Sequence, residues 1–214
     1  MYTGQHGMTA NTLKRIVLGA GTIHKNLTLG GSGSGNGNFN FAESVMFATS
    51  GGNSLEIVGT LYDIPIDGVG VKVQGTTIKT GETGKLTVNA LEMSPELLEY
   101  QLFGIMSDLK PLAGYSSGTT GEKIESKHYV ENLAYVGETA ADRKPVIIVF
   151  ERALCTSGLK VDGKSNEANV LPVTFEAYAQ PNVNTRLTSL GIHIYFPESS
   201  TVTQSAASAA AVTK

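Results

Sequence analysis

The sequence has 214 residues and a mass of 22.5 kDa, a length at which an all-β chain usually forms one domain. Sixteen lysines and arginines against 19 acidic residues give a net charge of −3, which argues against a general nucleic-acid-binding surface. Charged residues make up only 16% of the chain, 25 residues are glycine and none is tryptophan. Apolar residues, at 41%, suffice for a core, so the sparse charge suggests a surface that other subunits cover.

The single cysteine, Cys155, excludes an internal disulfide framework and a thiolate zinc cluster. No signature of a nucleophile surrounds it, so we interpret it as a small buried hydrophobic residue. The first apolar run, Ile16 to Leu18, stops at Gly19, which predicts no secretory leader. No run approaches the roughly 18 apolar residues of a membrane span.

Residues 1–13 are polar and mixed, and we expect them to form a flexible arm. The first ordered segment is predicted at 14–18, and a second short extended stretch at 22–29. The glycine-rich tract that follows offers no side chains to bury, so residues 30–41 are predicted to form a long flexible loop.

The next part of the chain alternates apolar and polar residues with the period of two that is typical of β-strands. Strands are predicted around 55–61, 69–74 and 86–91, with a bend or bulge at Gly59 and a turn at 81–84.

One helix is predicted at about residues 94–103. Ser94 is a suitable N-cap, Pro95 fits the first helical position and Glu96 favours the positive end of the helix. Leucines one turn apart supply an apolar face, and Gly104 is expected to end the helix.

Residues 107–127 are rich in glycine, serine and threonine and are predicted to be a second long flexible loop. The apolar run 145–150 predicts a strand buried on both faces. Alternation predicts further strands at 129–135, 173–178 and 192–196. The tail at 198–214 has no apolar face, and we expect it to be disordered.

Together these patterns predict a mainly β protein of eight or nine strands with one flanking helix. The expected architecture is an antiparallel β-sandwich or partly open barrel, formed by one domain over residues 14–197.

Two short motifs resemble nucleotide sites but lack the required context. Residues 158–165 match the spacing of a P-loop through Lys164. No helical pattern follows, and Asp162-Gly163 is typical of a turn, so a β-hairpin is predicted instead. Gly19-Ala20-Gly21 lacks the third glycine and the helix of a dinucleotide fold.

Other chemistry-bearing residues form no recognisable site. The four histidines lie far apart without metal-ligand spacing: His6, His24, His128 and His193. Capping and turn chemistry account for the glutamates beside the helix and for Asp63 and Asp67. We therefore expect no enzyme activity and no catalytic, cofactor or metal site.

A series of segments, by their order and spacing, resembles the major tail proteins, or tail tube proteins, of long-tailed (siphovirus-type) bacteriophages of Gram-positive hosts. The resemblance spans about residues 14–197. It rests on GGNSLEI at 51–57, IDGV at 66–69, KVQG at 72–75, LTVNAL at 86–91 before the helix, FERAL at 150–154, VTFEAY at 173–178 and IHIYF at 192–196.

The resemblance implies a structural virion protein that assembles in the host cytoplasm into stacked, hexameric rings. In that family the rings form a hollow tube through which DNA passes, and the tube meets tape measure, tail terminator and distal tail proteins. Long loops bridge the rings, and the loops at 30–41 and 107–127 are the candidates here. Four glutamates on the solvent phase of their strands are candidates for the lumen or the outer surface: Glu56, Glu131, Glu151 and Glu176.

Three alternatives remain open at the level of sequence. A tube protein of a contractile tail or of a phage-derived bacteriocin would share the fold but need a sheath. A monomeric surface- or carbohydrate-binding β-sandwich would need clustered loop aromatics, of which Tyr115 is the main one. A nucleotide-binding enzyme would have to use residues 158–165.

Overall fold

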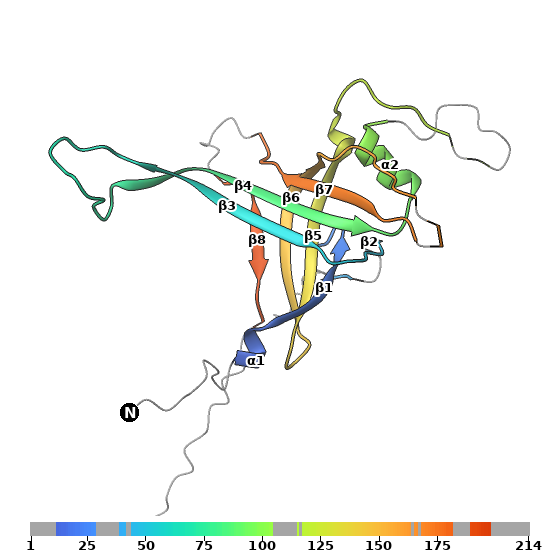
Figure 1. Cartoon of the computed structure of the whole chain (residues 1–214), viewed down its shortest axis with the longest axis horizontal. Helices are drawn as coiled ribbons and strands as arrows, with labels where there is room; N and C mark the ends of the chain where they lie inside the picture. The colour runs from blue at the N-terminus through green and yellow to red at the C-terminus, as the bar shows by residue number, and fades with distance from the viewer. Residues whose placement is uncertain are drawn as a thin grey trace, which may run out of the picture.

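The structure, a computed structural model, is mainly β, as predicted (Figure 1). It describes residues 12–28, 39–41, 44–104, 115, 117–163, 165–166, 168–181 and 189–197. Its helices are α1 (Thr12–Arg15), α2 (Pro95–Leu102) and the 3-10 turn η1 (Ser126–His128). Its strands are β1 (Val17–His24), β2 (Val45–Phe47), β3 (Ser54–Asp63), β4 (Thr77–Ala90), β5 (Tyr129–Thr139), β6 (Pro145–Cys155), β7 (Leu171–Ala177) and β8 (Ile192–Tyr195).

All eight strands belong to one antiparallel sheet with the order β2-β1-β5-β6-β7-β4-β3, and β8 pairs with β6. The sheet curls back on itself, because the chain after β2 pairs with the end of β4 through a bridge between Thr49 and Ala90. Two backbone hydrogen bonds of 2.9 Å, from Ser50 to Asn89 and from Leu91 to Ala48, flank that bridge. β3, β4 and β7 run across β5 and β6 in Figure 1, so the sheet resembles a partly open barrel.

The main core fills the inside of this curled sheet. Its largest fully buried side chains include Phe150, Phe175, Leu86 and Leu97. A second, smaller cluster lies on β5 and β6 and comprises Leu27, Ala134, Ile147 and Val149, with Phe39 and Phe41 packed against it. β6 therefore contributes to two clusters, which confirms the prediction of a strand buried on both faces.

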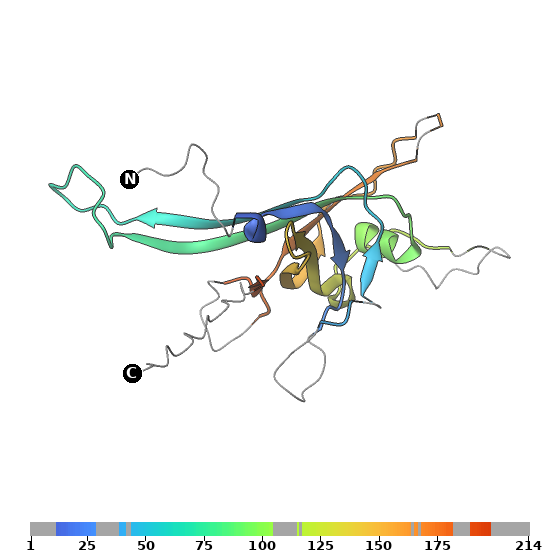
Figure 2. The same ribbon diagram turned by 90° about the horizontal axis from the view of Figure 1, so that it is seen from below.

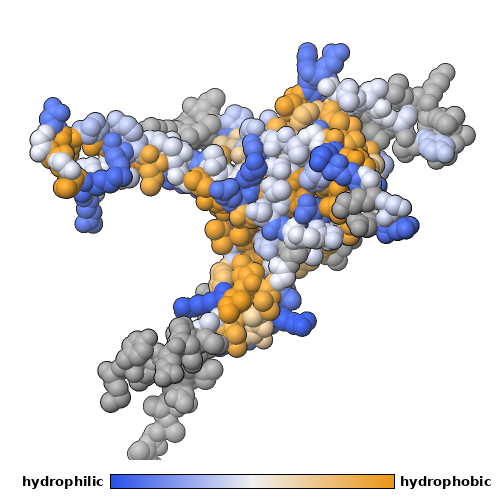
Figure 3. All heavy atoms as spheres, in the orientation of Figure 1, coloured by the Kyte–Doolittle hydropathy of each residue, from blue (hydrophilic) through white to orange (hydrophobic). Residues whose placement is uncertain are grey.

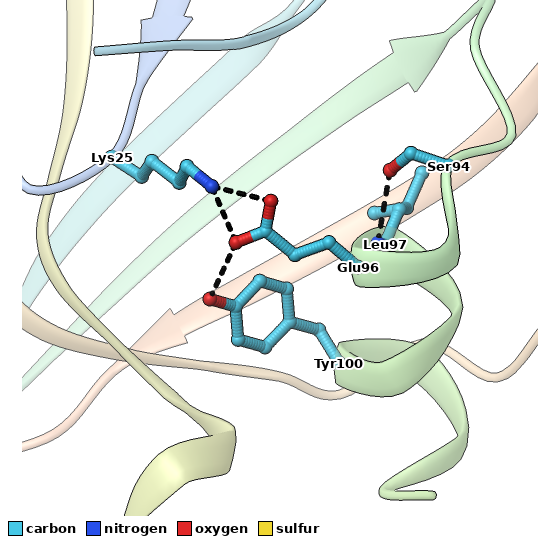
Figure 4. Close-up of polar contacts among 5 residues, drawn as sticks. All are labelled: Lys25, Ser94, Glu96, Leu97 and Tyr100. Carbon is cyan, nitrogen blue, oxygen red and sulfur yellow. Dashed lines mark hydrogen bonds and ion pairs between the residues drawn. The ribbon is translucent and has the colours of Figure 1, made fainter. Parts of the chain in front are cut away.

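Helix α2 begins and ends close to the predicted residues. The Ser94 hydroxyl accepts a 3.1 Å hydrogen bond from the Leu97 amide, which satisfies one of the otherwise unpaired amides of the first turn (Figure 4). The helix ends at Phe103, with φ of 51°, one residue before the predicted Gly104.

Polar contacts join α2 to the end of β1. Lys25 binds both carboxylate oxygens of Glu96, and the Tyr100 hydroxyl donates to the same carboxylate over 3.2 Å (Figure 4). Burial, reinforced by the Glu96 charge, raises the pKa of Tyr100 to about 12. The helix is thus attached to the sheet by Leu97 in the core and by Lys25 at the rim.

Several predicted elements are wrong in detail. Residues 69–74 form no strand but belong to the loop 64–76 that joins β3 to β4. Residues 81–84 form no turn, because β4 runs straight through them. Gly59 itself pairs regularly with Glu82; the register shift falls between Thr60 and Leu61, where Thr80 of β4 is the extra residue.

The loop predictions are tested only at their ends. Thr12 and Leu13, which were expected in the N-terminal arm, lie in α1. Residues 39–41 pack on the protein itself rather than extending from it, and residues 126–128 form η1. Residues 115 and 117–125 form no helix and no named strand, and residues 1–11, 30–38, 107–114, 116 and 198–214 lie outside the described residues.

Candidate assembly surface

The most prominent feature is a hairpin that leaves the body of the molecule. β3 and β4 pair from Ser54–Thr87 out to Asp63–Thr77, and their outer part, residues 58–83, projects well beyond the other strands in both views (Figures 1 and 2). Every residue of this outer part is described, and none of them is buried. We call residues 58–83 the arm.

The body ends and the arm begins near Gly84. A Cβ at this position would lie 2.8 Å from the Ile192 side chain and 3.1 Å from Ala177. The glycine therefore lets core side chains approach the backbone of β4 closely. Beyond it, none of residues 58–83 is buried, and Glu82 forms a 3.0 Å ion pair with Lys79.

The arm exposes more apolar side chains than an isolated hairpin would tolerate in water. Val71 is 77% exposed and Leu61 66% exposed, and the arm carries orange, hydrophobic residues along its length in Figure 3. The others at least 44% exposed are Val58, Tyr62, Ile64, Ile66, Val69, Val73 and Ile78. Apolar exposure on this scale marks an interaction site or an aggregation hazard.

The tip of the arm, residues 64–76, has a defined shape despite its exposure. Asp63 accepts a hydrogen bond of 2.5 Å from the Thr77 hydroxyl and forms an ion pair of 2.5 Å with Lys72. These two partners lower the pKa of Asp63, so the closing contacts are charge-assisted. Backbone bonds from Ile64 to Thr76 and from Thr76 to Val73 complete the loop.

Strand edges without a partner strand in the described structure include those of β3 and β8. β3 pairs only with β4, and β8 pairs only with β6. Ile194 on β8 and Phe196 just beyond it are also exposed. Such edges offer rows of unpaired amides and carbonyls to another chain unless something covers them.

A groove of about 1010 Å³ lies beside β1 on the body of the protein. Gly19 and Gly21 help to form its floor, and Val45, Phe47 and Phe41 supply apolar walls. Both glycines have positive φ, and the pairing of β1 with β5 shifts register between Leu18 and Thr22. The Gly-Ala-Gly triplet thus belongs to a bulged strand, and no helix follows it as a dinucleotide site would require.

His24 lies at the buried end of this groove. It is 3% exposed, and its ring nitrogens lie 2.8 Å from the hydroxyls of Ser44 and Thr22. Ser44 in turn donates to the carbonyls of residues 40 and 41. Burial lowers the pKa of His24. With both nitrogens bonded to uncharged groups, this histidine holds the loop before β2 against β1.

The four candidate glutamates are not brought together. Glu56 and Glu176 flank Lys85 in adjacent strands, and Glu176 lies 4.0 Å from the lysine nitrogen. Glu131 forms a 2.8 Å ion pair with Arg152. The fourth, Glu151, contacts His193 over 2.7 Å. Two of the four, Glu131 and Glu176, are thus partly neutralised by a basic side chain of the same subunit.

The segment 158–165 does not form the strands of a tight hairpin. Leu159 and Val161, predicted to alternate in strands, lie in the loop from β6 to β7, and Lys160 pairs with Asp162 over 2.7 Å. No helix begins in the described part of this loop, and Lys164 is not among the described residues. The geometry of a P-loop is therefore not found here.

The remaining reactive side chains are held in structural contacts. Cys155 is fully buried in the main core, as predicted, and burial raises the pKa of its thiol. His128 is also buried and accepts a 2.9 Å hydrogen bond from the Glu125 amide. Among the described residues, no group of three histidine, cysteine or acidic side chains could hold a metal ion.

The sequence features that could have revealed the arm are weak. The alternation at 69–74 was real, but it belongs to an exposed tip rather than to a core strand.

None of the helices in the described part of the chain is long and apolar enough to cross a bilayer. Comparison of the sequence with protein-family models and with curated proteins finds no match.

Proposed function

We propose that this protein is a structural subunit that polymerises into a hollow tube, the tail tube of a bacteriophage, and that it has no enzymatic role. The observation that carries the proposal is the arm, because a 26-residue hairpin with no buried residue and nine exposed large apolar side chains needs a partner. The resemblance of the sequence to tail tube proteins is the reason for proposing that the assembly is a tube.

Rough energetics support association through the arm. Covering a half-exposed valine or isoleucine is worth about 1 kcal/mol, so the nine residues together offer on the order of 10 kcal/mol. Association costs roughly 4–15 kcal/mol in lost freedom of motion. One arm contact is thus comparable with its cost, and a stable assembly would use the strand edges of β3 and β8 in addition.

In the proposed tube, neighbouring subunits extend one another's sheets around a ring, and rings stack through repeated, head-to-tail contacts. Contacts between unlike surfaces close into rings or continue as filaments, which is how one kind of subunit forms a tube. A DNA conduit should avoid a basic lining because phosphate contacts bind DNA strongly. The net charge of −3 and the paired glutamates are consistent with this.

The alternatives differ in how much the structure supports them. A tube of a contractile tail or of a phage-derived bacteriocin would use the same arm and edges and would differ by a surrounding sheath. A monomeric carbohydrate-binding protein gains no support, because the exposed arm carries mainly aliphatic side chains rather than a cluster of aromatic ones.

Negative-stain electron microscopy and sedimentation velocity of the full-length protein over a concentration series test the proposal. Rings or tubes of uniform diameter are expected, with a sedimentation coefficient that rises with concentration. A protein that stays monomeric at hundreds of micromolar, with its arm intact to proteolysis, would contradict it. Amorphous aggregate without a uniform diameter would contradict it equally, because it would show the arm to be merely sticky.

A further inference from the structure

We infer that the tip of the arm, residues 64–76, docks in the groove beside β1 of a second copy of this chain. The inference rests on the proposed self-assembly and names the surface that receives the arm. The two surfaces have matching chemistry, since the tip presents Ile66, Val69 and Val71 while the groove is walled by Val45 and Phe47.

The groove suits a peptide segment better than a small ligand. Its volume of about 1010 Å³ is at the upper end of the range for small-molecule pockets, and it is open along β1. Gly19 lines the groove without a side chain, so a backbone can approach it closely, whereas the Tyr135 ring covers the Cβ side of Gly21. Val45, on its wall, is 52% exposed among the described residues.

The arm of the same molecule cannot fill this groove. The tip and β2 lie at opposite sides of the molecule in both views (Figures 1 and 2). The stretch outside the described residues that follows β1, residues 29–38, is LGGSGSGNGN, and Leu29 is its only large apolar residue. A second copy, which carries the same arm pointing outward, supplies the apolar segment that the groove lacks.

Charges at the two surfaces are complementary. Glu138 and Arg143 lie on the groove wall, both exposed, and neither forms an ion pair within the described residues. On the tip, Asp67 is exposed and Lys72 has 82% of its side chain exposed. Lys72 is already paired with Asp63, so the pairing expected between the two copies is that of Asp67 with Arg143, which would add one ion pair beside the apolar contact.

The tip is also preformed, which reduces the entropy lost on docking. The hydrogen bonds of Asp63, Thr76 and Thr77 close the loop before any partner binds. In this contact the tip of one copy binds the groove of the next. Each copy therefore inserts its own arm into one neighbour and accepts the arm of another. Such a contact propagates from copy to copy, as a tube requires.

Site-specific crosslinking tests the docking directly. The only native cysteine, Cys155, is fully buried, so any disulfide between two copies must join the introduced cysteines. Proteins carrying Val71→Cys at the tip and Val45→Cys in the groove are mixed and oxidised under assembly conditions. A disulfide-linked dimer between the two variants is expected. The matched control replaces Val45→Cys with Glu122→Cys, an exposed site away from the groove, and should give no linked dimer with the tip variant.

Sedimentation of the same samples separates this inference from the proposed function. Assembly without a tip-to-groove disulfide, or with only tip-to-tip disulfides, would overturn the docking and leave self-assembly intact. A parent protein that does not assemble at all would overturn both. A Val45→Cys thiol that resists maleimide in the monomer would mean that the chain already covers its own groove, which also overturns the docking.

A charge exchange provides a second, non-covalent readout. Asp67→Lys and Arg143→Asp should each raise the protein concentration required for assembly about two- to fivefold. This range corresponds to the free energy of an exposed ion pair. The double variant should recover the parent's behaviour, because the pair is restored with reversed sign. Additive weakening in the double variant would contradict the pairing. Loss of assembly after delipidation, with recovery on adding lipid vesicles, would assign the groove to a lipid instead.

Discussion

At the scale of single residues, Gly84 sets the boundary between body and arm. Gly84→Val should destabilise the fold by about 1–3 kcal/mol, because the new side chain would overlap Ile192 and Ala177. Urea unfolding followed by circular dichroism measures the change. Gly81→Ala is the matched control, since its Cβ would meet only Thr60 at 3.6 Å and should leave stability unchanged or slightly raised. Equal effects of the two substitutions would contradict this account.

His24 should make stability depend on pH in the acid range. Because burial lowers its pKa, the unfolded chain takes up the proton first, and the unfolding free energy should fall as pH drops below about 6.5. His24→Gln should cost about 1–2 kcal/mol at pH 7 through its lost hydrogen bonds. It should also flatten the change between pH 7 and 5.

Urea titrations at several pH values check both effects of this substitution. An unchanged acid slope in the variant would assign the pH dependence to other groups. The contact of His24 with Ser44 could not be predicted from sequence, since Ser44 lies 20 positions away and only the pairing of β1 with β2 brings it to the ring.

At the scale of elements, the arm should be separable from the fold. Joining Thr60 to Gly81 by an Asn-Gly turn preserves their register and removes residues 61–80. Because none of the removed residues is buried, the urea midpoint of the body should change little, whereas assembly should be lost. Circular dichroism, urea unfolding and sedimentation of the same sample separate the two. Assembly by the shortened protein would contradict a role for the arm.

The accuracy of the sequence predictions also differs by element. The helix at 94–103 was predicted well, because its N-cap and proline act locally. The strand at 69–74 and the turn at 81–84 were wrong. Alternation alone cannot tell a core strand from an exposed apolar tip, and glycines that suggested a turn instead admit close packing in a long strand.

At the scale of the whole molecule, assembly should depend little on salt. The chain is sparsely charged, and the surfaces proposed to meet are mainly apolar, so screening by salt should remove only the weak ion pairs at the rim. Raising NaCl from 50 to 500 mM should change the assembly midpoint by less than about fivefold, whereas cooling should weaken assembly. Light scattering and sedimentation measure both. Disassembly by 500 mM salt would indicate an interface held by charge.

Local caps and hydrophobic periodicity were enough to predict the mainly β class, the capped helix, the buried Cys155 and the strand buried on both faces. Three features became visible only in the folded chain: β3 and β4 run out beyond the core as an arm, the Gly-Ala-Gly bulge lies beside a groove, and Glu56 and Glu176 share Lys85 while Glu131 and Glu151 have partners elsewhere. The extent of the arm depends on where along β3 and β4 the packing of core side chains ends. That limit is set by contacts between segments as distant as Gly84 and Ile192, which no local pattern records.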